Sequence, residues 1–264
     1  MTIPGNGAAA VERLGPWFHN LHLPDGTQTA PGHPLGDFPA VKWKQIEPYL
    51  PPSLAHVEVL DIGCNAGFYS FELARRGARV TAIDIDRRYL RQARWAASCY
   101  GLEDQIEFHE ASVYNFARCR RQWDLVWFLG VLYHLRHPLL ALDIVRGITR
   151  QQMLLQTLTC PGKANVRIRA SIGLDERDLM NRRGWPRMAF LEHALENDPT
   201  NWWAPNDACV EAMLRTSGFR VLARPGHEIY LCEPHPVESS FNAWSRRSEL
   251  QALFDSPPAG DWRT

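Results

Sequence analysis

Val59-Leu60-Asp61-Ile62-Gly63-Cys64-Asn65-Ala66-Gly67-Phe68-Tyr69-Ser70 is the most informative segment of this 264-residue chain, because an apolar run leads directly into a glycine-rich turn. Its apolar opening, preceded by Val57, predicts a parallel strand, because a strand buried on both faces needs a nearly continuous apolar run. The residues from Gly63 to Gly67 predict a tight turn, since glycine adopts positive φ and Asn65 tolerates the left-handed region. The pattern from Phe68 onward predicts a helix whose N-terminus points at whatever binds on the turn.

Two carboxylates flank this turn. Asp61 lies at the end of the first strand, and Asp84 ends the next apolar run, which begins at Arg79. A carboxylate at Asp84 is placed to accept both hydroxyls of a ribose, as in nucleotide-binding βαβ units. A negative charge at Asp61 suits a ligand with a positive charge close to its ribose. NAD puts a pyrophosphate there and favours Gly-x-Gly-x-x-Gly, which this chain lacks at Asn65 and Phe68; S-adenosylmethionine puts an ammonium and a sulfonium there.

The stretch resembles motif I of the class I S-adenosylmethionine-dependent methyltransferases, and Asp84 resembles their ribose-binding acid. The resemblance implies an α/β fold with a Rossmann-like sheet of seven strands, an enzyme that transfers methyl groups, and S-adenosyl-L-methionine as its cofactor. The alternative is a glycine-rich turn in an α/β protein that binds no cofactor. The strand-turn-helix context disfavours that alternative.

The remaining pattern fits this plan, with helices that end at glycines such as Gly77 and Gly101. We expect the strand order to reverse after the first strand, and the last two strands to form an antiparallel pair at the sheet edge. The expected strands are about 56–63, 78–85, 105–110, 123–130, 153–157, 219–223 and 228–232. The expected helices are about 67–76, 86–100, 138–148 and 206–216.

The chain outside this core is expected to be less regular. We expect the first ten residues to be mobile and residues 41–50 to form a short amphipathic helix. The expected divisions are an N-terminal extension that caps the substrate side (1–50), the methyltransferase domain (51–235) with an insertion after its fifth strand (about 158–204), and a C-terminal tail without clear pattern (236–264).

Composition excludes several classes of protein. The chain has 29 basic and 29 acidic residues, so no global field favours nucleic acid or an anionic membrane. Its six cysteines form no C-x-x-C pair, which disfavours a zinc site or a disulfide framework and favours a reducing compartment. No apolar run reaches membrane-spanning length, and the N-terminus lacks a signal-peptide pattern. We therefore expect a cytoplasmic protein without a membrane partner, and the oligomeric state stays open.

A second motif runs from Leu129 to Pro138, with the sequence Leu-Gly-Val-Leu-Tyr-His-Leu-Arg-His-Pro, at the carboxyl end of the fourth expected strand. Ligands of open α/β sheets bind outside such ends. The motif resembles the Gly-Val-Leu-Tyr-His segment of the bacterial tRNA wobble-uridine 5-oxyacetate methyltransferase family. The resemblance covers about residues 15–232 and includes Gly15-Pro16, Lys42-Trp43 and Asn201-Trp202-Trp203-Ala204-Pro205.

The resemblance also bears on the form of the cofactor. Members of that family that use carboxy-S-adenosyl-L-methionine hold its extra carboxylate with a lysine before the Gly-Pro, the tyrosine of the Tyr-His pair and a C-terminal arginine. Here Leu14 replaces the lysine, Tyr133 matches, and the tail has no Pro-Ala-Pro-x-Arg segment. Because an unpaired buried carboxylate is costly, we expect ordinary S-adenosylmethionine.

The expected site residues follow from both motifs. His134 is the first candidate for a base or an orienting group, since histidine titrates near neutrality, and Tyr133 is expected to line the methyl-transfer site. The alternative for His134 is a histidine that packs on the core at the strand end. Ser112 stands where many methyltransferases have an acid that contacts adenine, so that contact is expected to be weaker or made by backbone. The expected cofactor contacts are Asp61, Gly63, Cys64, Asn65, Gly67, Phe68, Asp84, Ile85, Ser112, Val113, Leu129 and Gly130, and the expected substrate contacts are Trp17, His19, His22, Trp202 and Trp203.

The two histidines in the N-terminal segment also have a purely structural explanation. His19 and His22 are more simply explained as partly buried loop residues, and no acidic cluster accompanies them, so we expect no metal.

Three functions remain open. The first is O-methylation of a small molecule such as a sugar or secondary metabolite, and the third is S-adenosylmethionine binding without catalysis. The second is methylation of a tRNA wobble uridine. The zero net charge and the lack of a recognised RNA-binding module argue against this function. Six arginines in the insertion fit either a solvated face or contacts with phosphates: Arg167, Arg169, Arg177, Arg182, Arg183 and Arg187.

Overall fold

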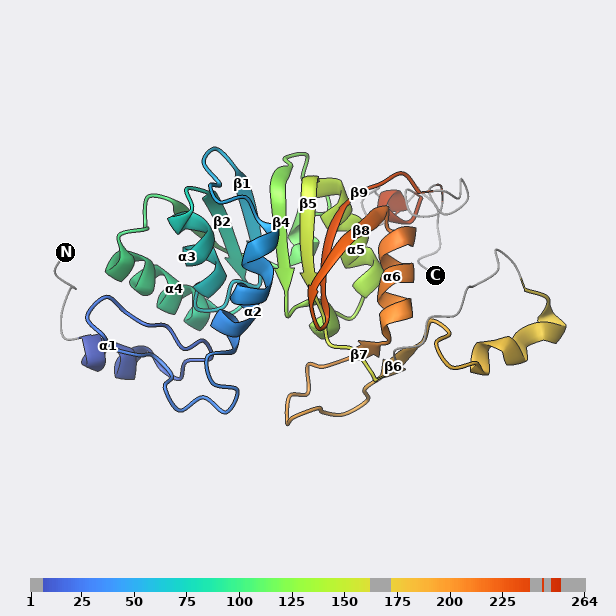
Figure 1. Cartoon of the computed structure of the whole chain (residues 1–264), viewed down its shortest axis with the longest axis horizontal. Helices are drawn as coiled ribbons and strands as arrows, with labels where there is room; N and C mark the ends of the chain where they lie inside the picture. Colours follow the sequence, from blue (N-terminus) through green and yellow to red (C-terminus); the bar gives the residue numbers. More distant parts are fainter. Residues whose placement is uncertain (1–6, 162–171, 238–243, 245–247, 253–264) are drawn as a thin grey trace, which may run out of the picture.

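The computed structural model describes residues 7–161, 172–237, 244 and 248–252, and seven of its strands form one mixed sheet (Figure 1). The sheet order is β3-β2-β1-β4-β5-β9-β8, with β1 to β5 parallel and β9 antiparallel to both of its neighbours. The strands are β1 (Glu58–Ile62), β2 (Arg79–Asp84), β3 (Ile106–Glu110), β4 (Trp123–Leu129), β5 (Thr149–Gln156), β8 (Phe219–Gly226) and β9 (Ile229–Pro234).

The strand order confirms the predicted reversal. Strand β1 pairs with β2 on one side and with β4 on the other, so the chain turns back across β1. The carboxyl ends of β1 and β4 therefore open the crevice in which such sheets bind ligands. The predicted antiparallel pair is also present, but only β8 is an edge strand, because β9 lies between β5 and β8.

Helices cover both faces of the sheet (Figure 1). Alternate residues of a strand face opposite sides, and the core divides accordingly. Val59 and Trp127 belong to one buried cluster with α2, α3 and α4, and Leu60 and Phe128 belong to another with α5 and α6. These helices are α2 (Phe38–Ile46), α3 (Phe68–Arg75), α4 (Arg87–Tyr100), α5 (Pro138–Ile148) and α6 (Asp207–Thr216).

The ends of α4 show how local sequence sets the helix boundaries. The side chain of Asp86 accepts a hydrogen bond from the amide of Arg88 at 2.7 Å, which satisfies one of the free donors at the helix start. Gly101 ends the helix with φ +67°, as the glycine in the sequence indicated.

The N-terminal segment is more ordered than expected. Residues 7–10, expected to be mobile, begin helix α1 (Gly7–Leu14), and residues 1–6 lie outside the described part of the chain. Helix α1 is short, so its stability depends on docking. The buried side chain of Gln92 on α4 donates to the carbonyls of Leu14 at 2.8 Å and Pro16 at 2.9 Å. The sequence of α1 alone does not show this contact.

Helix α2 begins at Phe38 and ends at Ile46, not at residues 41 and 50 as predicted. The early start is possible because Pro39 lies in the first turn, where a missing amide donor costs little. A 3₁₀ turn, η1 (Glu47–Tyr49), completes the segment.

The insertion between β5 and α6 interrupts the alternation as predicted. It contains a 3₁₀ helix, η4 (Leu174–Asn181), and a two-stranded sheet of β6 (Met188–Phe190) and β7 (Trp203–Pro205). Helix η4 has no buried residues and projects from the body of the molecule (Figure 1). Of the insertion arginines, Arg167 and Arg169 lie outside the described residues.

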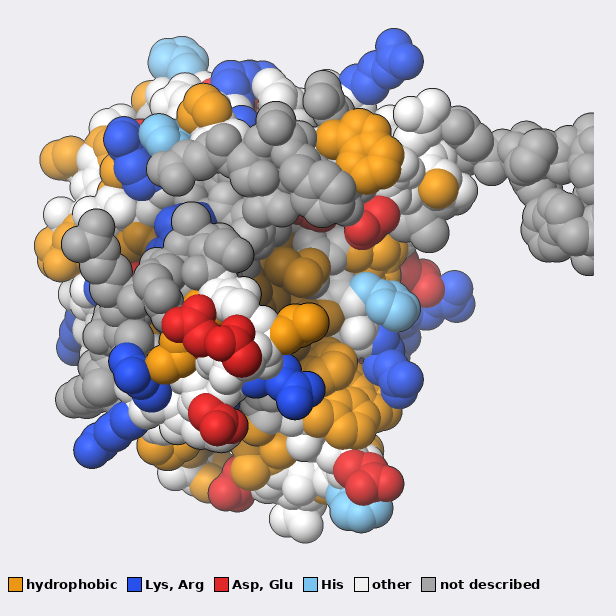
Figure 2. Space-filling view, turned by 90° about the vertical axis from the view of Figure 1, so that its right-hand side faces the viewer, with side chains coloured by type: hydrophobic (Ala, Val, Ile, Leu, Met, Phe, Trp, Pro, Cys, Tyr) orange, Lys and Arg blue, Asp and Glu red, His pale blue; other side chains and the backbone are white. Residues whose placement is uncertain are grey.

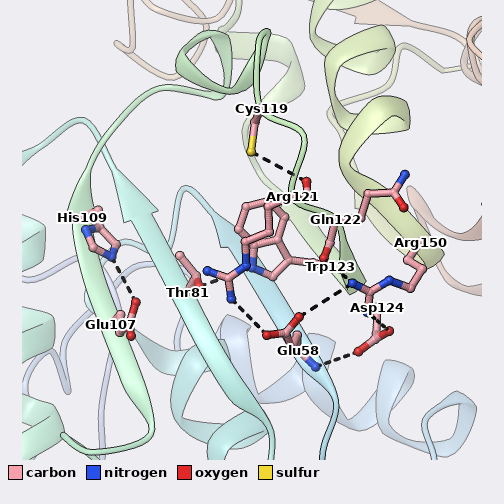
Figure 3. A network of polar contacts seen from close by, with 10 residues as sticks. All are labelled: Glu58, Thr81, Glu107, His109, Cys119, Arg121, Gln122, Trp123, Asp124 and Arg150. Carbon is pink, nitrogen blue, oxygen red and sulfur yellow. Dashed lines mark hydrogen bonds and ion pairs between the residues drawn. The ribbon is translucent and has the colours of Figure 1, made fainter.

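A polar network ties the strands together at the end of the sheet where β1 and β4 begin (Figure 3). Asp124 accepts hydrogen bonds from the amide of Glu58 at 3.0 Å and from Arg150 at 2.7 Å. Arg121 donates to the Glu58 carboxylate at 3.2 Å. The network joins β1, β4 and β5 at their beginnings and leaves their carboxyl ends for a ligand.

None of the described helices combines the length and the apolar character that a bilayer span requires.

Candidate functional site

The turn after β1 adopts the backbone conformation that its residues indicated. Gly63, Asn65 and Gly67 have φ of +74°, +50° and +92°. The amides of Gly63 and Cys64 both donate to the carbonyl of Ile83, at 2.8 and 2.9 Å, so the turn is fastened to the end of β2.

Side chains cannot be added at the two glycines without moving their neighbours. A Cβ on Gly63 would overlap the Val131 side chain, and one on Gly67 would lie 2.6 Å from the Phe71 ring. The turn therefore needs glycine for both conformation and close packing.

Asp84 holds this turn from the neighbouring strand. Its Oδ2 accepts a hydrogen bond from the amide of Asn65 at 2.9 Å, and its Oδ1 accepts one from the amide of Asp86 at 2.8 Å. Burial raises the pKa of Asp84, and these backbone hydrogen bonds oppose that shift. Each carboxylate oxygen retains a further lone pair, so Asp84 can still accept the hydroxyls of a ribose.

Asp61 lies deeper, with only 2% of its surface exposed. Its Oδ2 accepts a hydrogen bond from the Ser70 hydroxyl at 2.6 Å, which joins β1 to α3. Burial raises the pKa of Asp61 to about 7, the hydrogen bond from Ser70 opposes the shift, and the charge of Asp84 adds to it. At neutral pH this carboxyl group therefore responds strongly to any charge nearby, and a cation would favour its ionised form.

The residues expected beside an adenine differ in accessibility. Ile85 is 73% exposed and follows Asp84 directly, whereas Val113 is buried in the core. Ser112 caps a 3₁₀ helix, η2 (Val113–Phe116): its hydroxyl accepts from the amide of Tyr114 at 3.4 Å and its amide donates to Asn115 at 2.8 Å. The Ser112 side chain is thus engaged in local hydrogen bonds, and its contact with an adenine stays a prediction.

Other residues of the expected cofactor set have structural partners. The thiol of Cys64 is buried, and burial raises its pKa well above the usual range, which makes it a poor nucleophile. Leu129 is buried at the end of β4, and Gly130 follows it with φ +73° and donates its amide to the carbonyl of Gln156 at 3.1 Å. Phe68 packs edge-on against Tyr69 at the start of α3.

Tyr133 and His134 lie together on a 3₁₀ turn, η3 (Leu132–His134), just after β4. Their ring centroids are 4.2 Å apart. Burial raises the pKa of Tyr133 to about 12, with the charges of Glu228 and Asp198 adding to the shift, so its hydroxyl is neutral at physiological pH. Burial lowers the pKa of His134, and Asp198 opposes this change.

The insertion packs directly onto this turn. The amide of Trp202 donates to the carbonyl of Tyr133 at 2.9 Å, and the indole of Trp203 donates to the carbonyl of Leu135 at 3.1 Å. The guanidinium of Arg136 lies over the Trp202 ring, 4.2 Å from its centroid. Both tryptophans expected on the substrate side are therefore brought to the Tyr-His pair.

The three expected residues of the N-terminal segment have different positions. Trp17 is buried and packs on Trp95 with ring centroids 5.8 Å apart, which is a core position. His22 pairs with Asp37 at 2.9 Å and is largely exposed. His19 is 5% exposed and packs edge-on against Phe68. Its Nδ1 has no hydrogen-bond partner, and burial lowers its pKa to about 3, so it is neutral.

A polar cluster beside Tyr133 was not predicted from the sequence. It is formed by Lys42, Gln156 and Glu228. The ammonium of Lys42 donates to Gln156 Oε1 at 3.2 Å, and Gln156 Nε2 donates to Glu228 at 3.3 Å. A Cβ built on Gly130 would lie 3.7 Å from the Tyr133 hydroxyl and 3.8 Å from Gln156 Oε1, so the cluster borders that hydroxyl. Lys42 was noted only as part of a resemblance, and nothing in the sequence linked it to Glu228.

Within the described ranges, no group of three or more histidine, cysteine, aspartate or glutamate side chains is arranged to hold a metal ion.

Comparison with known proteins adds to this picture. A family model described as "Methyltransferase domain" matches residues 59–151. The chain is 27% identical over 252 residues to a tRNA U34 carboxymethyltransferase of Cellvibrio japonicus, which covers 94% of the chain and 67% of the relative. It is 31% identical over 221 residues to a protein of the same name from Methylococcus capsulatus, which covers 81% of the chain but only 59% of that relative.

Among solved structures, the N-terminal domain of EvdMO1 with SAH bound has a similar fold. It superposes with a TM-score of 0.59 at 18% identity, over 86% of this chain and 94% of that one. This likeness concerns the arrangement of the elements.

We expect Gly63→Ala to destabilise the protein by about 1–3 kcal/mol, because the added methyl group requires a strained φ and overlaps Val131. Gly147→Ala is the matched control: Gly147 lies in α5 with no atom within 4 Å of an added Cβ, so it should stabilise by about 0.5–1 kcal/mol. Urea unfolding followed by circular dichroism measures both. Equal effects of the two substitutions would contradict the role assigned to the turn.

Proposed function

Because this chain belongs to the class I S-adenosylmethionine-dependent methyltransferases, we propose that it methylates a hydroxyl group of a small-molecule acceptor, such as a sugar or secondary metabolite. The observation that carries the proposal is the meeting of two groups of residues at the switch point of the sheet. Asp61 and Asp84 flank the glycine turn after β1, and Tyr133 and His134 follow β4, the strand beside it.

The residues of the turn fit the cofactor. Gly63 and Gly67 give the turn its positive-φ conformation, and Asp84 has free lone pairs for ribose hydroxyls. Asp61 offers a carboxylate to a cationic group. When bound, S-adenosylmethionine supplies a methyl group activated by its sulfonium; the protein has to hold the acceptor in line and remove its proton.

We expect binding of S-adenosylmethionine to release protons near pH 7, because a cation close to Asp61 favours the ionised form of a carboxyl group whose pKa is about 7. The direction of the pH dependence follows from the same pKa shift. The affinity for S-adenosylmethionine should rise as the pH increases through 7 and should level off above it. Isothermal titration calorimetry in buffers of different ionisation enthalpy measures the proton count. Asp61→Asn, which keeps the acceptor for Ser70, should abolish the release; an unchanged proton count in this variant would contradict the assignment.

Charge near Tyr133 supports the ordinary cofactor over its carboxylated form. The carboxylate of Glu228 is 17% exposed and acts on Tyr133 strongly enough to help raise its pKa. It also accepts hydrogen bonds from the amide and the hydroxyl of Thr159, at 2.6 and 2.9 Å, which hold it in place. The ammonium of Lys42 in the same cluster already interacts with the charge of Glu228. A further carboxylate beside the Tyr133 hydroxyl would compete with Glu228 for this cation, and like charges at close range repel.

We expect the wild-type protein to bind S-adenosylmethionine more tightly than carboxy-S-adenosylmethionine. Glu228→Gln should reduce this preference by roughly tenfold, equivalent to about 1.4 kcal/mol, because it removes the negative charge. Its amide oxygen can still accept from Thr159, whereas the hydrogen bond from Gln156 Nε2 is lost. Glu233→Gln is the matched control, since Glu228 directly precedes β9 and Glu233 pairs with Arg220 at the far end of that strand. Competition calorimetry gives both constants. Tighter binding of the carboxylated form by the wild type would refute the choice of cofactor.

The chief alternative acceptor is a tRNA wobble uridine, because the relatives at 27% and 31% identity are named as tRNA U34 carboxymethyltransferases. Charge speaks against it in this chain. Between residues 172 and 200 four arginines are outnumbered by six carboxylates: Arg177, Arg182, Arg183 and Arg187 against Asp175, Glu176, Asp178, Glu192, Glu196 and Asp198. On the described part of the face in Figure 2, basic side chains are scattered among acidic and apolar ones. Binding to phosphates needs a concentrated positive surface.

Transfer of a radiolabelled methyl group into a cell extract tests the proposal. We expect the label in the small-molecule fraction, and none with Asp84→Asn, which weakens the ribose contact. Label in the RNA fraction would replace the proposal by the tRNA alternative. No transfer to any fraction, despite measured binding of S-adenosylmethionine, would favour a binding protein without catalysis.

A further inference from the structure

The insertion supplies a chain of hydrogen bonds to His134. Nδ1 of His134 lies 2.9 Å from the hydroxyl oxygen of Thr200 and 3.3 Å from its carbonyl oxygen. The Thr200 hydroxyl donates to Oδ1 of Asp198 at 2.6 Å, and Oδ2 of Asp198 is 3.9 Å from Nδ1. His134 and the two insertion residues are 64 or more positions apart in the sequence, so only the folded chain brings them together.

These contacts decide which ring nitrogen carries the proton. A threonine hydroxyl has one hydrogen, and in Thr200 that hydrogen is directed to Asp198. The hydroxyl oxygen therefore acts as an acceptor toward His134, and the carbonyl oxygen of Thr200 can only accept. Nδ1 faces two acceptors and must be the protonated nitrogen of the neutral ring, which leaves the lone pair on Nε2.

The loop that provides these acceptors is fixed on both sides. The amide of Thr200 donates to Asp198 at 2.8 Å, and the backbones of Leu195 and Asp198 bond to each other. Two residues further along, the amide of Trp202 donates to the carbonyl of Tyr133. The loop and the Tyr-His turn are thus joined by backbone hydrogen bonds as well as by side chains.

We infer that Asp198 and Thr200 are positioning residues that hold His134 as a general base, with Nε2 as the atom that removes the proton of the acceptor hydroxyl. The inference rests on the proposed function and names residues for it that neither motif contains. As the acceptor oxygen bonds to the methyl carbon, the carbon–sulfur bond breaks with its electron pair left on sulfur, and the hydroxyl proton passes to Nε2. The carboxylate of Asp198 then faces the imidazolium that forms.

The charges around the pair suit this role. Burial lowers the pKa of His134, and Asp198 partly restores it, so the ring is neutral and able to accept a proton at neutral pH. Burial would raise the pKa of Asp198, but hydrogen bonds from the hydroxyl and amide of Thr200 outweigh it, and the net shift is downward. The ring packed against His134 is that of Tyr133, whose hydroxyl is neutral because burial and the charges of Glu228 and Asp198 raise its pKa.

The protonation state can be read without any acceptor or cofactor. In protein labelled with ¹⁵N-histidine, long-range ¹H–¹⁵N spectra assign the tautomer of His134, with His134→Gln identifying its signals among those of the ten histidines. We expect the Nδ1–H form in the wild type and in Thr200→Ser, and a large population of the Nε2–H form in Thr200→Val. A wild-type ring protonated on Nε2 would overturn the inference.

Titration of the same signals tests Asp198. Asp198→Asn should lower the pKa of His134, because it removes the charge that favours the imidazolium, whereas Glu192→Gln, an exposed carboxylate of the same insertion, should leave it unchanged. Equal pKa values in the wild type and Asp198→Asn would overturn the role of Asp198.

A base role is tested by the pH profile of methyl transfer into the fraction of cell extract that takes up the label. The rate should rise with pH through the pKa of His134, since the neutral ring is the active form. Asp198→Asn should move that midpoint to lower pH, and Thr200→Val should reduce the plateau by roughly tenfold. If His134 showed the expected tautomer while neither substitution changed the pH profile of methyl transfer, the role of His134 as a base would be refuted. That result would not contradict the proposed methyl transfer.

Discussion

The turn after β1 depends on one constraint, the attachment of its backbone to the end of β2. Two consecutive amides of the turn bond to a single carbonyl of Ile83, and the amide of Asn65 bonds to the carboxylate of Asp84. An open glycine turn would otherwise sample many conformations. Held in this way, the turn places the start of α3 beside the carboxyl groups of Asp61 and Asp84 at the ends of two strands.

The same attachment links stability to function. Asp84 holds the turn with one lone pair of each oxygen and keeps the others for a ligand. Asp61 is buried against Ser70, and burial disfavours its ionised form, which raises its pKa. A cationic ligand nearby would favour the ionised form. Carboxyl groups with a raised pKa are common in functional sites.

The acceptor side is built differently, from segments that are distant in the sequence. The N-terminal segment brings His19 against Phe68, helix α2 brings Lys42 to Gln156, and the insertion brings Thr200 to His134. The polar network lies at the opposite end of the sheet, where it joins the beginnings of β1, β4 and β5 (Figure 3). The candidate site residues and the polar network thus lie at opposite ends of the strands.

From local patterns alone, namely apolar runs, glycines in a turn and carboxylates at strand ends, the sequence predicted the strands of the sheet and the glycine turn after β1. It predicted the reversal of strand order through the family that this turn resembles. It missed α1, whose stability comes from Gln92 on a distant helix, and the true start of α2 at Phe38. Only the tertiary structure decided that Trp17 is a core residue, that Glu228 faces Tyr133, and that Thr200 directs the proton of His134. The physical reason is that these contacts join residues far apart in the chain, and no spacing or composition encodes which side chains meet when β9 inserts beside β5 and the insertion docks on the Tyr-His turn.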